Sequence, residues 1–242
     1  MIRLEEIGYA YNGVSALENV SFEIEKGEKI VLMGVNGSGK STLLKLLDGL
    51  IFPNKGSYYY RDELITKRKT GSKPFNAYFR SRMVMLFQKP DVMLFNPTVY
   101  DELGFGPRQL GAKDIDKEIH YWAERLRITH LLDKQPFNLS CGEKKKVALA
   151  SLLIIDPEVI ILDEPFSYLD PQSTEWMVNF LTKLDKTLIV SIHNLKIASL
   201  ISNRLLVLSN THRLIYDGAL EIFSASEEKQ KTAGMFTTLN LQ

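Results

Sequence analysis

The sequence predicts an α/β protein built on a largely parallel β-sheet. Short, β-rich apolar runs at residues 159–162 and 188–192 are typical of parallel strands that are buried on both faces. Residues 41–50, 114–132 and 143–155 carry apolar side chains at helical spacing. Because strands alternate with helices along most of the 242 residues, an α/β fold is the expected class.

Further strands are expected near the N-terminus and before the central helices. Residues 21–34 suggest strands that end in an apolar stretch, and short strands are expected at 57–60 and 84–87. The intervening residues 61–82 are polar and basic, and we interpret them as a solvated surface excursion. The chain after residue 223 has weak periodicity, so we expect a short helix followed by a loose end.

Composition excludes several classes of protein. The formal net charge is +1, so no global field favours nucleic acid, and none is expected as a partner. The single cysteine, Cys141, cannot form an internal disulfide and fits a reducing compartment. The N-terminal residues carry charges where a signal peptide needs an apolar core, and no apolar run approaches the roughly 20 residues of a membrane span. We therefore expect a soluble, cytoplasmic protein.

A glycine-rich loop between a strand and a helix carries the strongest chemical signal. It matches the pattern G-x-x-x-x-G-K-[ST], in which backbone N–H groups and a helix N-terminus surround phosphate oxygens. The lysine supplies charge to the β and γ phosphates, and the following serine places a hydroxyl on Mg²⁺. We expect this loop to bind ATP through Gly34, Val35, Asn36, Gly37, Ser38, Gly39, Lys40, Ser41 and Thr42.

Two of the predicted strands end in side chains that suit hydrolysis. Asp163 and Glu164 follow the run at 159–162, where ligands bind in open parallel sheets. Asp163 suits a role near Mg²⁺, and Glu164 can polarise an attacking water. His193 follows the other run and could contact the γ-phosphate or hold the water and Glu164 in line. Taken alone, two acids and a histidine at strand ends could equally be structural.

The segment Leu-Ser-Cys-Gly-Glu at residues 139–143 precedes a predicted helix. Ser140 and Glu143 form an S-x-x-E capping box, which by itself explains both residues. The same helix N-terminus, with Ser140 and free backbone N–H groups, could also face a γ-phosphate.

The order of these segments resembles the ATP-binding-cassette (ABC) ATPases over nearly the whole chain. The resemblance rests on the phosphate loop, Gln88, the segment at 139–143, the acids at 163–164 and His193. It implies a P-loop NTPase core with an antiparallel β subdomain and an inserted helical subdomain. The single domain would then divide into a core at about 1–90 and 156–224, a helical signature subdomain at about 91–155, and a tail at 225–242.

Several residues gain a role from this resemblance alone. Tyr11, preferred over Tyr9, looks like the aromatic residue that stacks on adenine. Gln88 looks like the glutamine that links Mg²⁺ and water to the helical subdomain, and residues 167–170, ending in Asp170, resemble the segment through which paired cassettes communicate. The resemblance also implies ATP and Mg²⁺ as cofactors. A second ABC ATPase would complete the site, with the signature Ser140, Cys141, Gly142 and Glu143 facing the partner's ATP.

A longer stretch points to one subfamily of these ATPases. Residues 94–107 read LFNPTVYDELGFGP, with Leu110-Gly111 following, and are similar to the cobalt/nickel and energy-coupling-factor importer ATPases. That subfamily implies integral membrane partners and a peripheral position on the inner face of the cell membrane. The basic residues at 67–82 could then contact lipid headgroups or a membrane subunit instead of solvent.

The chain departs from the family pattern at three positions, and other functions remain open. Cys141 stands where the family usually has glycine, Glu143 where it has glutamine, and Asn194 where aspartate is common. If residue 141 needs a positive φ, a cysteine there costs about 1 kcal/mol. We hypothesise that this chain pairs with a different cassette, giving two unequal sites.

Two other functions compete with that of an importer ATPase. One is a non-transport cassette in repair, translation or cluster assembly, and the other is a nucleotide-dependent switch without turnover.

Overall fold

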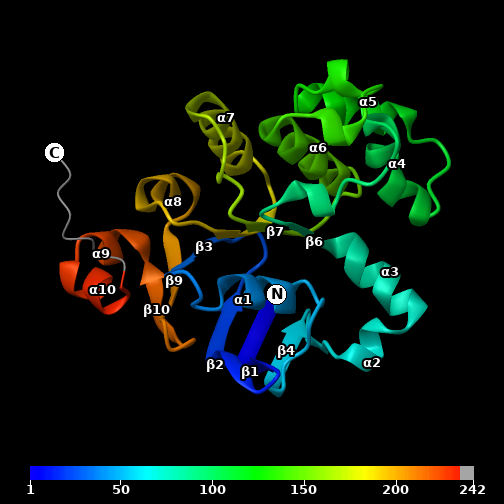
Figure 1. Ribbon diagram of the computed structural model, residues 1–242. Coiled ribbons are helices and arrows are strands. Elements are labelled where there is room, and N and C mark those ends of the chain that lie inside the picture. The colour runs from blue at the N-terminus through cyan, green and yellow to red at the C-terminus, as the bar shows by residue number, and fades with distance from the viewer. Residues whose placement is uncertain (235–242) are drawn as a thin grey trace.

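The protein is described by a computed structural model that covers residues 1–234. Its centre is a six-stranded sheet within those residues, in which only the edge strand β10 runs antiparallel to its neighbour (Figure 1). In spatial order the strands are β10 (Leu214–Ala219), β9 (Arg204–Leu208), β3 (Lys29–Gly34), β8 (Thr187–Ser191), β7 (Val159–Asp163) and β6 (Met83–Leu86). The predicted α/β class is confirmed.

Alternating side chains of this sheet feed two apolar cores. In β3, Val31 and Met33 join one core, whereas Ile30 and Leu32 join the other. Every residue of β7 and β8 is buried, as expected for strands covered on both faces. The register pairs Leu162 with Val190, so the two strands end together at one edge of the sheet.

An antiparallel sheet lies over one face of the central sheet. Its spatial order is β2 (Val14–Ile24), β1 (Ile2–Tyr11), β4 (Lys55–Tyr60) and β5 (Glu63–Leu64). Helix α1 (Lys40–Leu47) packs in the same apolar core as these strands and β3. The Tyr58 hydroxyl on β4 links the antiparallel sheet to α1 by donating a hydrogen bond of 2.7 Å to the Leu47 carbonyl. This is the antiparallel subdomain that the sequence predicts.

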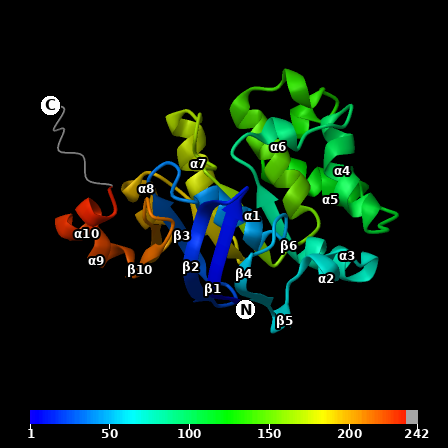
Figure 2. The same cartoon turned by 60° about the horizontal axis from the view of Figure 1, so that its bottom comes forward.

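The core that contains Val31 and Met33 lies between the central sheet and a set of helices. They are α4 (Val99–Gln109), α5 (Asp116–Arg125), α6 (Cys141–Leu153), α7 (Pro171–Thr182) and α8 (Leu195–Ile201), with 3₁₀ turns at Pro90–Val92, Thr129–Leu131 and Pro136–Asn138. In Figures 1 and 2, α4, α5 and α6 form a group beyond the β6 edge of the sheet. Among residues 1–234, no helix is both long and apolar enough to cross a membrane. The division into core, helical subdomain and tail stays a prediction.

The C-terminal part begins with α9 (Leu220–Ser224), whose Leu220 and Phe223 are buried. The short helix expected after residue 223 is present as α10 (Glu227–Thr232). The loose end expected beyond it falls on residues 235–242, which lie outside the described residues.

The interpretation of residues 61–82 as a surface excursion is wrong in part. The segment contains β5 and two helices, α2 (Lys67–Thr70) and α3 (Lys73–Arg82). Ile65 and Phe79 are buried in the core of the antiparallel subdomain, and Phe79 makes an edge-to-face contact with Tyr60 at 5.7 Å between ring centroids. Phe75 lies one turn before Phe79 on α3 and stacks on it at 6.2 Å between ring centroids, so one face of this helix anchors the segment.

A contact between the partly exposed Arg80 and the buried Asp48 joins α3 to the end of α1. The Asp48 carboxylate is 5% exposed and accepts a hydrogen bond of 2.7 Å from Arg80, which also donates 2.6 Å to the Asp48 carbonyl. Burial raises the pKa of Asp48 to about 7, and the Arg80 charge offsets only part of that rise. The folded state therefore holds a proton at Asp48 in a pH range where the unfolded chain does not.

This pair predicts a pH dependence of stability. Because the folded pKa is raised, the stabilisation is complete below pH 4 and is lost as pH rises towards 7. We expect the unfolding free energy of the native chain, relative to an Asp48→Asn variant, to fall by about 2 to 3 kcal/mol between pH 5 and pH 8. Urea unfolding of both proteins at the two pH values measures the difference. Parallel pH profiles would mean that Asp48 is ionised throughout.

Candidate functional site

The phosphate loop connects β3 to α1 through left-handed backbone that favours glycine. Gly34 and Gly39 have φ of 150° and 104°. A Cβ atom at Gly39 would lie 2.3 Å from the Ala16 carbonyl oxygen, so β2 comes too close for any side chain there. The N–H groups of the first turn of α1 are thereby presented to the loop interior.

Lys40 is buried at the centre of this loop. Its ammonium donates to the carbonyls of Gly34 at 2.8 Å and Val35 at 3.1 Å. Burial lowers the pKa of Lys40, while the carboxylates of Glu164 and Asp163 act in the opposite direction. The nearby Ser38 hydroxyl is buried without a hydrogen-bond partner. A polar atom orphaned in this way inside a loop of N–H donors fits a loop that binds a polar ligand.

A cavity of about 1030 Å³ opens beside the loop and gathers residues from distant segments. Gln88, Glu164 and His193 line it together with the predicted phosphate-binding residues other than Gly34, Val35 and Ser38. Its complete lining is Tyr11, Val14, Ser15, Ala16, Asn36, Gly37, Gly39, Lys40, Ser41, Thr42, Gln88, Glu164, Ser167, Tyr168, His193 and His212. His212, to which the sequence analysis assigned no role, has a buried Nδ1 without a hydrogen-bond partner.

The Glu164 carboxylate is the hub of the polar side chains in this cavity. One oxygen accepts hydrogen bonds from Gln88 Nε2 at 2.8 Å and from the Ser167 hydroxyl at 3.0 Å. The other oxygen accepts from His193 Nε2. A carboxylate offers about four acceptor positions, so these three donors leave one for a water molecule.

Asp163 lies behind the cavity rather than in its lining. The residue is 6% exposed, and its Oδ1 accepts a hydrogen bond of 2.7 Å from the Ser191 hydroxyl. Ser191 in turn accepts from the Glu164 N–H at 2.8 Å. It therefore fixes both acids from the adjacent strand β8, a role that the sequence analysis missed because it appears only when β7 and β8 are paired.

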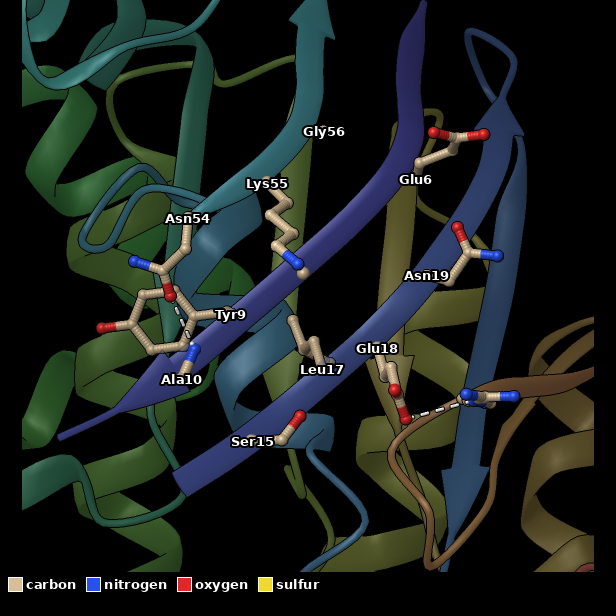
Figure 3. Close-up of a pocket in the computed structure, with 12 residues that line it drawn as sticks. Glu6, Tyr9, Ala10, Ser15, Leu17, Glu18, Asn19, Asn54, Lys55 and Gly56 are labelled. Carbon is tan, nitrogen blue, oxygen red and sulfur yellow. Dashed lines mark hydrogen bonds and ion pairs between the residues drawn. The ribbon is translucent and has the colours of Figure 1, made fainter. Parts of the chain in front are cut away.

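The two candidate tyrosines separate in space. Tyr11 lines the phosphate-loop cavity and is 42% exposed. Tyr9 lies in a different cavity of about 480 Å³ on the antiparallel sheet, beside Asn54 and Lys55 (Figure 3). The rings touch edge to face at 4.8 Å between centroids. This placement supports Tyr11 as the adenine contact, which stays a prediction.

The signature segment caps α6 as its S-x-x-E pattern predicts. The Ser140 N–H donates to the Glu143 carboxylate at 2.8 Å, and the Glu143 N–H donates to the Ser140 hydroxyl at 3.3 Å. The hydrogen bond from the Ser140 hydroxyl is the main cause that lowers the pKa of Glu143. Cys141 is the first residue of the helix and has no positive φ, so the suspected backbone strain is absent.

None of these signature residues lines the phosphate-loop cavity of its own chain. Asp170, the residue expected to serve communication between cassettes, caps α7 by accepting from the Ser173 N–H at 2.8 Å. Likewise, Asn194 caps α8 by accepting from the Lys196 N–H at 2.9 Å, so this departure from the family pattern keeps a capping acceptor. The roles assigned to these residues across a dimer stay predictions.

The predicted Mg²⁺ ligands fit a metal that is shared with a nucleotide. Ser41 and Gln88 face the cavity, with Asp163 behind them. In the described part of the chain, no cluster of three His, Cys, Asp or Glu side chains could hold a metal by itself. Mg²⁺ commonly keeps one or two protein ligands and takes the rest from phosphates and water. The donor set therefore suits Mg²⁺ bound together with ATP.

Comparison with known proteins decides the family. The family model for ABC transporters matches residues 17–167, more than half of the chain. The chain is a member of the ABC transporter ATP-binding family. It is an ATPase of that family, and the phosphate loop lies within the matched region.

Relatives of this ABC ATPase include proteins named for metal import. The nickel import ATP-binding protein LarO of Lactiplantibacillus plantarum is 38% identical over 90% of this chain and 92% of its own length. Among solved structures, cbiO1 of Clostridium perfringens, part of the ABC transporter complex cbiONQ, has a TM-score of 0.81 at 31% identity, covering 97% of this chain and 94% of the other. The dimeric cassette MJ0796 bound to ADP and phosphate has a TM-score of 0.80 at 25% identity, covering 91% and 99%.

Proposed function

We propose that this ABC ATPase energises a membrane importer for a metal ion such as nickel or cobalt, or for a vitamin. The hydrolytic half-site, in which Glu164 is held by Gln88 and His193 beside the phosphate loop, carries the energising role in this proposal. In this proposal the chain lies at the inner face of the membrane and contacts integral membrane subunits.

The proposed mechanism uses the side chains of the cavity. Lys40 neutralises charge on the β and γ phosphates, and the loop N–H groups hold their oxygens. Glu164 accepts the proton of the attacking water while His193 and Gln88 keep its carboxylate in place. Ser41 and Gln88, with Asp163 behind them, would hold Mg²⁺, which would supply positive charge to the phosphates.

A second cassette completes the site in this proposal. The signature at the N-terminus of α6 lies outside the cavity of its own chain, so the N–H groups of Cys141 and Gly142, which the capping box does not use, can face another chain's γ-phosphate. Tyr168, which lines the cavity mouth and is 74% exposed, marks the side that a partner would cover. The dimeric arrangement of the MJ0796 cassette supports a dimer here.

Support for import comes from the stretch at residues 94–107. It comprises the loop before α4 and most of that helix, whose buried Glu102 carboxylate accepts hydrogen bonds of 2.9 Å from the N–H groups of Phe95 and Asn96. This leaves Phe95 65% exposed against Phe105, with ring centroids 4.9 Å apart. Exposed aromatic pairs are common at protein interfaces. The nickel-import relatives favour a membrane transport subunit as the partner.

Co-purification with membrane proteins, followed by ATP-dependent uptake in vesicles, tests the proposal. The test substrate is radioactive nickel or cobalt, or a vitamin that the purified membrane subunit binds. We expect it to accumulate across the vesicle membrane only when ATP is present on the side of the membrane that carries the cassette. Uptake should be lost with Lys40→Met and kept with Lys45→Met, which replaces a lysine on the same helix outside the cavity. Full ATPase activity with no membrane partner and no uptake would favour the non-transport cassette.

We further propose that the second cassette is a different chain. Cys141 places a side chain at the start of the signature helix, where it crowds a partner's phosphate, and Glu143 adds negative charge beside it. The partner's nucleotide site would then turn over more slowly than the one built on Lys40. A homodimer of the purified chain with full ATPase activity would contradict this pairing.

A further inference from the structure

We propose that Lys145 is a positioning residue that holds the segment carrying the catalytic carboxylate. Lys145 lies on α6, two residues after Glu143 of the signature, and its side chain is completely buried. Its ammonium reaches across to residues 164–167, the chain that leaves β7. The proposed mechanism assigns this lysine no role.

The contacts are confined to the backbone of that segment. Lys145 Nζ donates to the carbonyls of Ser167 at 2.5 Å, Pro165 at 2.9 Å and Glu164 at 3.3 Å. A lysine ammonium has three donors, and all three are directed at carbonyl oxygens. Burial lowers the pKa of Lys145, while Cys141 and Glu164 act in the opposite direction.

The segment needs such support because its backbone is strained. Glu164 has a φ of 47° and Tyr168 a φ of 63°, in the left-handed region that side chains other than glycine disfavour. Ser191 holds the Glu164 N–H from one side, and Lys145 holds its carbonyl from the other. Without the ammonium, three carbonyls lose a donor and the backbone can relax away from this conformation. The Glu164 carboxylate would move with it.

Through the same lysine, a movement at one nucleotide site of a dimer reaches the other site. This consequence rests on the proposed function. The first turn of α6 is the signature expected to face the partner's ATP, and Lys145 follows it directly. A shift of α6 on closure would therefore reach the Glu164 segment through the ammonium. The positioning role itself requires only one chain.

Steady-state ATPase assays of Lys145→Met and Lys145→Gln test the positioning role. Methionine keeps the shape of the side chain and removes the donors, whereas glutamine keeps two donors on a shorter chain. For methionine we expect kcat to fall about 10- to 100-fold with KM within about 3-fold, since Lys145 does not line the nucleotide cavity. Glutamine should recover part of kcat.

The matched control is Lys144→Met. Lys144 precedes Lys145 on α6 and forms an ion pair of 2.6 Å with the exposed Asp91, outside the cavity. We expect its kcat and KM to stay at the native values. A Lys145→Met variant that folds and keeps native kcat would overturn the proposal. If that variant does not fold, native kcat in Lys145→Leu, which also lacks hydrogen-bond donors, overturns it.

Hydrogen exchange separates this inference from the proposed function. The Ser167 N–H donates to the Glu164 carbonyl at 3.2 Å within the held segment. In Lys145→Met we expect faster exchange at residues 164–169 and native exchange in the phosphate loop, whether or not transport is found. Uniformly faster exchange throughout the chain would mean that Lys145 serves only general stability, and would contradict the positioning role.

Discussion

Replacing Glu164 with glutamine is expected to lower ATP turnover by at least about 100-fold while leaving ATP binding intact. In the native chain the carboxylate accepts from Gln88 Nε2 at 2.8 Å, from Ser167 Oγ at 3.0 Å and from His193. A glutamine has nearly the same shape and keeps one acceptor oxygen, but it cannot take a proton from water. ATP should therefore stay bound, and the closed dimer should accumulate.

The Glu164→Gln chain is assayed together with its partner cassette in the presence of ATP and Mg²⁺. Phosphate release measures turnover, and size-exclusion chromatography measures the dimer. Glu221→Gln is the control, because Glu221 is exposed on α9 and lies outside the cavity. We expect it to turn over ATP like the native chain and to show no ATP-dependent dimer accumulation. Native turnover in Glu164→Gln would remove Glu164 from the role of base.

Replacing Lys40 with methionine is expected to weaken ATP binding by about 100-fold. A charged hydrogen bond contributes about 1.5 to 3 kcal/mol, and Lys40 is placed to form such bonds with phosphate oxygens. The ammonium is only 6% exposed and lies near the carboxylates of Glu164 and Asp163. Its removal leaves these negative groups facing the phosphates without a counter-charge, which increases the loss.

Binding of a fluorescent ATP analogue, measured at several salt concentrations, checks this prediction. The control is Lys45→Met, in the last turn of the same helix, for which we expect native affinity. Urea unfolding of both variants shows whether either loses stability, since methionine at position 40 also forfeits two hydrogen bonds to loop carbonyls. Equal affinity of the Lys40 variant and the native chain would exclude the loop as the phosphate site.

The features predicted from sequence are those whose signals are local. The phosphate loop is a continuous pattern, and the capping box at Ser140 and Glu143 needs only four residues. The buried runs at β7 and β8 are short and apolar throughout, which makes them recognisable without their neighbours. Helices α4, α7 and α8 were not predicted as elements, although the stretch containing α4 indicated the subfamily.

The features that were missed depend on contacts between distant segments. Ser191 is an unremarkable strand residue until pairing with β7 brings its hydroxyl to Asp163 and Glu164. Lys145 belongs to a run of three lysines that suggests a solvated helix face, yet the packing of α6 against residues 164–167 buries it completely. Phe75 and Phe79 stand at helical spacing, but two aromatic residues in an otherwise polar and basic stretch were too weak a signal to predict that residues 61–82 pack against the core.

The sequence alone was enough to predict the chemistry proposed for this protein: a loop for ATP phosphates, two acids and a histidine at strand ends, and a capped signature helix. These follow from short patterns, because backbone geometry near a glycine loop or a helix N-terminus is set by a few adjacent residues. Only the tertiary structure decided which donors hold Glu164, that Tyr11 rather than Tyr9 lines the cavity, and that Lys145 is buried. Those outcomes depend on strand register and helix packing, which bring together residues that are far apart in the chain.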